Sequence, residues 1–174
     1  MRGRDLSRFP ARIETGIRLH RHLDRFTDTH PALKAARQRI SQVPLRFSGI
    51  VMDVMFDHYL ACRWNRFSDD SLDRHARFVH QALAMHEQYL PDSLQRFMVV
   101  LERERILQGN VHLHAIELTL KRIAAKSDKL AILQIDTTEL AGLRDIFVEP
   151  FDDFYPDLQL AANNFLAESQ ESAS

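Results

Sequence analysis

The chain has 174 residues, of which 45% are hydrophobic and 27% are charged, with one cysteine and a net charge of −1. This composition is too apolar for a disordered chain, and a single cysteine excludes an intramolecular disulfide framework. No apolar run approaches the roughly 20 residues that cross a bilayer. The arginines that follow Met1 are not followed by the apolar segment of a signal peptide, so none is expected. We therefore expect a cytoplasmic protein without a membrane partner.

Long segments of helical period, separated by few glycines and prolines, predict an all-α protein. We expect a single domain over residues 1–169, a bundle of about seven or eight helices, followed by a frayed tail over residues 170–174. Ser127 and Asp128 are expected to open a helix. The main segments of helical period span residues 12–25, 32–40, 45–65, 69–89, 92–107, 111–126, 136–147 and 149–167.

The sequence predicts where two helices begin or end. The run from Thr27 to Pro31 should end the first helix, because its polar residues and proline suit a helix start. Pro150 should lie near the start of a last helix, for the same reason.

Charge is divided unevenly along the chain. Residues 1–66 contain 13 Lys and Arg against 6 Asp and Glu, a net charge of +7, and the remainder carries −8. A basic half of this kind indicates an acidic partner, unless the two halves only neutralise each other within the fold.

Two pairs of side chains suit a metal site. His20 and Asp24 lie four residues apart in the first helix, so both project from one face. Asp53 and Asp57 have the same spacing, with His58 adjacent, in the most apolar segment of the chain, where we expect the carboxylates to be buried. Buried carboxylates need a cation or a neighbouring arginine, and arginines alone would satisfy them as ion pairs. A hard ion held by His and Asp would be Mn²⁺, Mg²⁺ or Fe²⁺.

Two motifs together resemble one family. Residues 16–28, GIRLHRHLDRFTD, resemble the G-I-x-x-H-R-x-I-D-x-x-T-D segment of the acyl carrier protein phosphodiesterases. Residues 52–60, MDVMFDHYL, followed by Trp64, are similar to that family's D-V-M-x-D-H-x-L helix. A looser likeness reaches residues 154–156 and covers most of the chain.

The resemblance implies an HD-domain-like all-α fold that hydrolyses 4′-phosphopantetheine from the serine of holo-acyl carrier protein, with Mn²⁺ as the expected metal. It implies metal ligands at His20, Asp24, Asp57 and His58. It also implies catalytic roles, in contact with the phosphate or with the ligands, for Arg21, Asp28 and Asp53.

The family resemblance also predicts the partner. Acyl carrier proteins are strongly acidic, so the basic half should dock the carrier, and no nucleic acid is expected. The docking residues expected are Arg18, Arg25, Arg37, Arg39 and Arg46.

One departure from the family concerns the N-terminus. Family members begin with a further segment that contains His-x-His and an Asp, and Met1 aligns just after that Asp. We expect a chain without this segment to expose apolar surface and to self-associate. Two alternatives remain at this point: an HD-like phosphohydrolase that acts on nucleotides, and a non-catalytic helical binding module.

Overall fold

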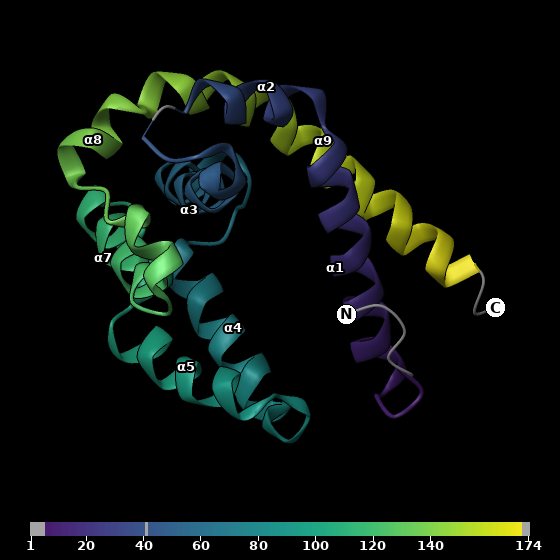
Figure 1. The fold of residues 1–174 in the computed structure, drawn as a ribbon. Helices are drawn as coiled ribbons and strands as arrows, with labels where there is room; N and C mark the ends of the chain where they lie inside the picture. The colour runs from purple at the N-terminus through teal and green to yellow at the C-terminus, as the bar shows by residue number, and fades with distance from the viewer. Residues whose placement is uncertain (1–5, 41, 172–174) are drawn as a thin grey trace. The chain divides into compact units, whose positions relative to one another are not determined.

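The computed structural model describes residues 6–40 and 42–171, and every regular element within those ranges is a helix (Figure 1). The all-α prediction is therefore confirmed. None of the described helices is both long and apolar enough to cross a membrane. In chain order the helices are α1 (Ala11–Thr29), α2 (Pro31–Arg39), α3 (Leu45–Cys62), η1 (Trp64–Arg66), α4 (Leu72–Met85), η2 (Glu87–Tyr89), α5 (Asp92–Arg103), α6 (Ile106–Gly109), α7 (Leu113–Ala124), η3 (Asp128–Leu133), α8 (Thr137–Gly142) and α9 (Arg144–Glu171), where η marks a 3₁₀ helix.

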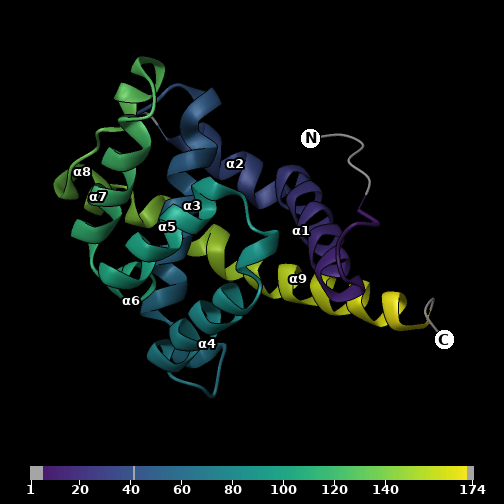
Figure 2. The same cartoon turned by 90° about the horizontal axis from the view of Figure 1, so that it is seen from below.

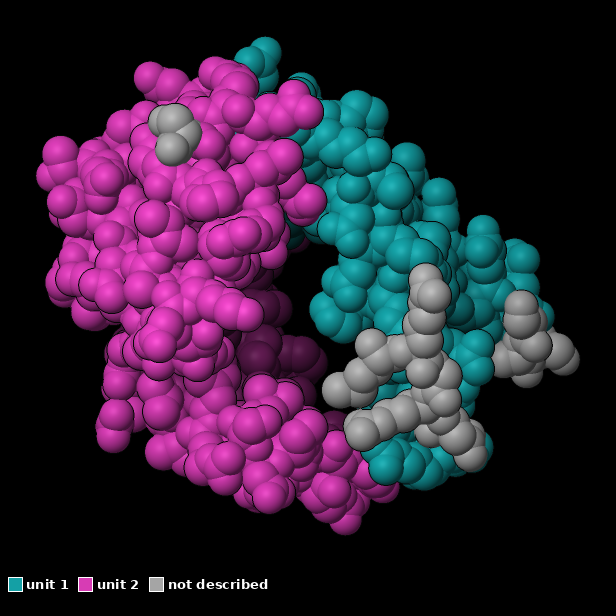
Figure 3. All heavy atoms as spheres, viewed as in Figure 1, with its two compact units in different colours: residues 1–36, 149–174 teal, residues 37–148 magenta. Residues whose placement is uncertain are grey.

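The chain divides into two compact units, which Figure 3 colours separately. Unit 1 consists of Met1–Ala36 and Glu149–Ser174, and unit 2 consists of Arg37–Val148. Helices α2 and α9 each contribute residues to both units. The single domain over residues 1–169 stays a prediction.

Unit 2 is built around α3. This helix packs against α7, and α7 packs in turn against η3 and α8 (Figures 1 and 2). The Tyr59 hydroxyl of α3 also donates a hydrogen bond to the Arg144 carbonyl oxygen at 3.1 Å. The large apolar side chains that are fully buried in this unit come from several of its helices: Val51, Met52, Met55, Ile116, Leu120, Leu133, Leu140, Leu143 and Phe147.

Unit 1 pairs α1 with the C-terminal part of α9, and the two run side by side in both ribbon views (Figures 1 and 2). The rings of Phe26 and Phe154 stack with centroids 6.2 Å apart. His30, just after α1, places its Nε2 atom 3.3 Å from Oδ2 of Asp157 and its ring against Phe154. These aromatic contacts hold the two helices together although α1 has no fully buried residue.

The first helix is longer than its sequence predicts. It continues to Thr29, whose hydroxyl bonds back to the Arg25 carbonyl oxygen inside the last turn. The chain then turns extended at His30, because a residue that precedes a proline disfavours the helical region. The break therefore lies at His30 and Pro31 and does not include the Thr-Asp-Thr run.

The predicted break before the last helix is wrong, since α9 runs without interruption through Pro150 and Pro156. A proline inside a helix costs about 3 kcal/mol. Phe147 and Phe151 flank Pro150 and are almost fully buried, and each buried phenylalanine stabilises the fold by about 1.5–3 kcal/mol. Burial therefore offsets the lost backbone hydrogen bond. Helix α9 also reaches Glu171, so part of the predicted tail is helical, and residues 172–174 lie outside the described residues.

Several helix starts agree with the sequence. The Ser71 side chain caps α4, and Ser127 caps η3 by accepting from the Lys129 amide. Asp136 forms a capping box with Glu139 at the start of α8. The expected helix over residues 92–107 is instead divided, because Arg105 adopts a left-handed backbone conformation between α5 and α6.

Candidate active site

Helix α3 places Asp53 and Asp57 on the side that faces away from the core and turns His58 toward the segment before α7. Both carboxylates are exposed and His58 is half-buried. The expectation that the carboxylates are buried is wrong, because the spacing of four keeps both on the side of the helix that faces away from the core. The apolar residues around them fill the core instead: Val51, Met52, Val54 and Met55.

Asp57 is electrostatically unusual. Burial among protein atoms, and then repulsion from the Asp53 carboxylate, raise the pKa of Asp57 from 3.8 to about 6. The side chain nevertheless keeps solvent-accessible surface. A ligand can therefore reach the carboxylate. Because burial and the Asp53 charge destabilise the ionised form of Asp57, binding of a cation or a proton there is favourable.

His58 is oriented by a distant backbone group. Its Nδ1 atom lies 2.7 Å from the carbonyl oxygen of Asn110, a buried residue at the start of the loop before α7. A carbonyl oxygen only accepts hydrogen bonds, so Nδ1 carries the hydrogen and, in the neutral ring, the lone pair lies on Nε2. This is the arrangement in which histidine binds a metal ion or accepts a proton.

Cys62 lies one turn beyond His58, with Sγ 3.6 Å from Nδ1 and 3.5 Å from the Val111 carbonyl oxygen. Burial raises the pKa of the Cys62 thiol, although Arg144 and Arg63 oppose the shift. A thiol whose pKa is raised is a poor nucleophile near neutral pH. Cys62 therefore lies against the His58 ring, and its raised pKa does not favour a role as nucleophile.

In unit 1, the predicted pair on α1 forms. His20 Nδ1 lies 3.6 Å from Asp24 Oδ1, and both side chains are exposed. His22 faces another direction, where its ring lies 5.2 Å from that of Phe165. Asp28 is exposed near the C-terminal end of α1 and is part of the helix.

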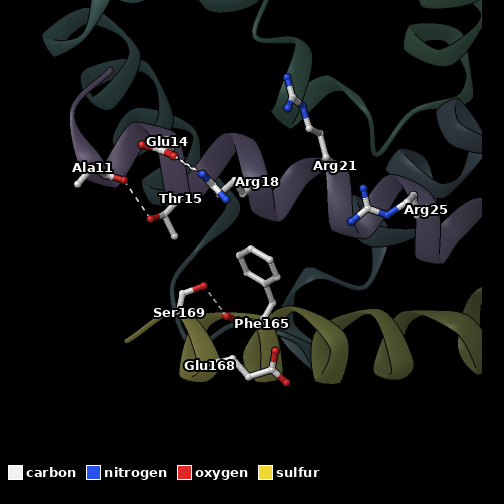
Figure 4. Close-up of a pocket in the computed structure, with 9 residues that line it drawn as sticks. All are labelled: Ala11, Glu14, Thr15, Arg18, Arg21, Arg25, Phe165, Glu168 and Ser169. Carbon is white, nitrogen blue, oxygen red and sulfur yellow. Dashed lines mark hydrogen bonds and ion pairs between the residues drawn. The ribbon is translucent and has the colours of Figure 1, made fainter. Parts of the chain in front are cut away.

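A groove of about 740 Å³ runs between α1 and α9 within unit 1 (Figure 4). Arg18, Arg21 and Arg25 line it from α1, as their spacing of three and four predicts. Phe165 points toward α1 from α9, whereas the Arg21 side chain extends away from α9 (Figure 4). Glu14 neutralises part of this charge, since its Oε1 atom lies 2.6 Å from Nη2 of Arg18. Arg21 and Arg25 have no ion-pair partner among the described residues.

The remaining docking candidates lie in unit 2. Arg37 and Arg39 occupy the last turn of α2, and Arg46 occupies the first turn of α3. The Arg37 guanidinium lies along α3 at Gly49, where an added Cβ atom would be 3.6 Å from it. Arg37 and Arg46 are therefore grouped near the N-terminal end of α3.

The metal site itself stays a prediction. His20 and Asp24 belong to unit 1, whereas Asp57 and His58 belong to unit 2. In the ranges 6–40 and 42–171, no cluster of three or more His, Cys, Asp or Glu side chains could hold a metal ion. Each unit contributes one pair of the candidate ligands, and either pair alone is too small a set for the octahedral site that Mg²⁺ or Mn²⁺ prefers.

Comparisons with known proteins connect this arrangement to one family. The sequence profile described as acyl carrier protein phosphodiesterase matches residues 1–158. The chain belongs to this family. A relative of that name from Enterobacter sp. (strain 638) is 30% identical over 168 residues, which cover 94% of the chain and 86% of the relative. Relatives of the same name from Klebsiella pneumoniae (strain 342) and Photorhabdus laumondii are 32% and 29% identical over 94% of the chain, covering 86% and 83% of their own lengths. No solved structure matches the chain.

Membership of the acyl carrier protein phosphodiesterase family confirms the resemblance read from the two motifs. The likeness to HD-domain folds remains a prediction. Sequence reasoning missed Asn110, whose backbone carbonyl fixes the orientation of His58 from 52 residues away. No local signal marks such a contact, because any residue type supplies a carbonyl oxygen.

Proposed function

We propose that this protein hydrolyses the phosphodiester that joins 4′-phosphopantetheine to a serine of holo-acyl carrier protein. The products are the apo-carrier, with a free serine hydroxyl, and 4′-phosphopantetheine. The family match over residues 1–158 supports the assignment of the acyl carrier protein as the substrate. The observation that carries the proposal within the structure is the oriented imidazole of His58, beside a carboxyl group whose pKa is raised to about 6.

The residues of α3 supply the groups that this reaction needs. The phosphorus–serine oxygen bond breaks as water attacks phosphorus, and one proton must reach the serine oxygen. His58 offers Nε2, either to hold a metal ion or to accept the proton of the attacking water. Asp53 lies one turn from Asp57 and makes a cation beside the two carboxylates favourable.

We propose a divalent metal, Mn²⁺ above all, with His20, Asp24, Asp57 and His58 as its ligands. Such an ion would polarise a phosphoryl oxygen and would lower the pKa of bound water. The chemistry of the donors supports this, since mixed His and Asp sets select hard divalent ions. Arg21 and Asp28 are proposed to contact the phosphate or the ligands, where a guanidinium would stabilise charge on the phosphoryl oxygens.

We propose that the carrier protein docks on the basic residues Arg18, Arg25, Arg37, Arg39 and Arg46, in a cytoplasmic setting. Arg25 supports this docking role more strongly than Arg18. Both line the groove of unit 1, but Glu14 neutralises the charge of Arg18. Self-association through exposed apolar surface is a further prediction, and sedimentation across micromolar concentrations measures it.

The direct test is incubation of holo-carrier protein with the purified chain, with Mn²⁺ or with a chelator, followed by intact-mass measurement. We expect conversion to apo-carrier with Mn²⁺ and none with the chelator. Equal conversion with Mn²⁺ and with the chelator would contradict the proposed metal dependence. No conversion in either condition would contradict the proposed function.

A further inference from the structure

A second groove, of about 550 Å³, lies within unit 2 at the N-terminal end of α3. Arg46 and Phe47, in the first turn of α3, form one side of it. Ser127, Lys129 and Leu130, at the start of η3, form the other. Phe47 and Leu130 give the groove apolar walls, and two cations stand at its edges.

Both cations are free to bind a partner. Neither Arg46 nor Lys129 has an acidic partner within the parts of the chain that the structure describes. The Arg46 guanidinium instead lies 4.7 Å from the centroid of the Phe47 ring. Asp128 is exposed beside Lys129 and does not line the groove. Several other basic side chains of unit 2 are paired, at Arg74 with Asp70, Arg105 with Asp73 and Lys121 with Glu117.

Helical geometry places this groove on the same face of α3 as the candidate catalytic residues. Arg46 precedes Asp57 by eleven residues, and Phe47 precedes His58 by eleven. Eleven residues make about three turns, with an angular offset of about 20° and a rise of about 16 Å. Asp53, seven residues after Arg46, falls on the same stripe. A ligand that reaches His58 along this face therefore also meets the groove.

We propose that this groove is a docking site for the body of the acyl carrier protein. The inference rests on the proposed function and adds Phe47, Ser127, Lys129 and Leu130 to the residues that recognise the substrate. Acidic side chains of the carrier pair with Arg46 and Lys129, and an apolar side chain of the carrier inserts between Phe47 and Leu130. An acidic protein that carries the scissile phosphodiester on its surface has the charge that complements this groove.

The distance along α3 fits a protein substrate. A standard protein interface covers about 800 Å² on each partner, which corresponds to a patch about 30 Å across. A groove about 16 Å from the reacting group lies within such a patch, whereas the phosphodiester alone would not reach it. Contacts at this distance act on binding and leave the chemical step unchanged.

The test is a charge reversal with a matched control. Lys129→Glu inverts one cation of the groove, and Lys126→Glu makes the same change three residues away on an exposed residue that does not line it. For Lys129→Glu we expect KM for holo-carrier to rise about fivefold or more, with kcat within about twofold of wild type, because charges at a docking rim act on encounter and binding. The Lys126→Glu variant should raise KM by a smaller factor than Lys129→Glu and keep kcat within about twofold of wild type, because Lys126 does not line the groove. Lys129→Arg should keep the wild-type KM.

Carrier binding, measured by anisotropy of a labelled holo-carrier, separates this proposal from the proposed function. If wild type turns over the carrier and the Lys129→Glu and Lys126→Glu variants have equal KM, the docking site is overturned. The proposed function then still stands. Weaker binding by Lys129→Glu alone supports the docking site even if the wild-type chain does not turn over. A wild-type chain that neither binds nor converts the carrier overturns both.

Discussion

The Nδ1 atom of His58 and the backbone carbonyl oxygen of Asn110 lie 2.7 Å apart, which fixes both the rotation and the tautomer of the imidazole. Asn110 is itself buried, so the acceptor is held in place by the packing around it. The contact fixes Nε2 as the nitrogen available for a metal ion or a proton.

This relationship predicts the effect of His58→Asn. The asparagine amide can replace Nδ1 as the donor to the Asn110 carbonyl, and the group at Nε2 is lost. We expect kcat for holo-carrier hydrolysis to fall by about 10²–10⁴, the usual contribution of a positioned acid or base. Circular dichroism should show an unchanged helical spectrum. His112→Asn, at the N-cap of α7, is the matched control and should keep full activity, because asparagine is a good N-cap. Equal activity in the two variants would exclude His58 from the reaction.

The raised pKa of Asp57 predicts how stability depends on pH. The folded protein holds this proton with a pKa of about 6 and the unfolded chain with a pKa near 3.8, so the folded state binds more protons between these values. The contribution of Asp57 to stability is therefore complete below pH 3.8 and is lost as the pH rises through 6. In a chelator, Asp57→Asn should unfold with a free energy about 1 kcal/mol higher than wild type at pH 7.5, a modest value because solvent screens this accessible group. The difference should disappear near pH 4.

The matched control for this measurement is Asp53→Asn. It removes the repulsion that is the second cause of the shift, so the pKa of Asp57, followed by NMR, should fall and remain above 3.8. An Asp57→Asn variant that is less stable than wild type at pH 7.5 would contradict the assigned environment.

The contact between His30 and Asp157 predicts a coupling within unit 1. The ring of His30 is 12% exposed and lies against Phe26 and Phe154, whereas the Asp157 side chain is 59% exposed. His30→Ala should lower the free energy of unfolding by about 2 kcal/mol, mainly through lost aromatic packing. Asp157→Asn should cost only about 0.5 kcal/mol. A double-mutant cycle by urea denaturation should give a coupling smaller than the His30→Ala effect, and a larger coupling would mean that the ion pair holds the helices together.

The basic residues near the start of α3 predict salt-sensitive association. Reversal of both Arg37 and Arg46 to Glu should slow binding of the carrier about tenfold at low salt, because these charges steer an acidic partner. The difference from wild type should shrink at high salt, where the screening length falls well below its value of about 8–10 Å at physiological ionic strength. Stopped-flow association at two salt concentrations measures this. Association that responds to neither salt nor charge reversal would mean that the basic half only balances the acidic half.

Local rules predicted much of the fold and less of the site. Ser71, Ser127 and Asp136 mark helix starts through bonds within one turn, so their sequence signals suffice. Pro150 does not mark the start of a helix, because burial of Phe147 and Phe151 is a tertiary effect that the local sequence does not reveal.

Among the site residues, too, the local sequence predicted some features and tertiary contacts determined the others. The spacing of four correctly placed His20 beside Asp24 on α1. The exposure of Asp53 and Asp57 was mispredicted, since a run of apolar letters indicates that a helix is buried but not on which side its carboxylates lie. The partner of His58 is a carbonyl oxygen 52 residues away, which only a three-dimensional structure identifies.

The central claim is that this chain removes 4′-phosphopantetheine from holo-acyl carrier protein through the imidazole of His58. Intact-mass spectrometry of holo-carrier incubated with wild type or His58→Asn, both with Mn²⁺, tests it most directly. We expect wild type to lower the carrier mass by that of the phosphopantetheine group and to leave a free serine, and His58→Asn to leave the holo mass intact over the same time. A holo-carrier whose mass is unchanged by wild type, or is lowered equally by both proteins, would contradict it.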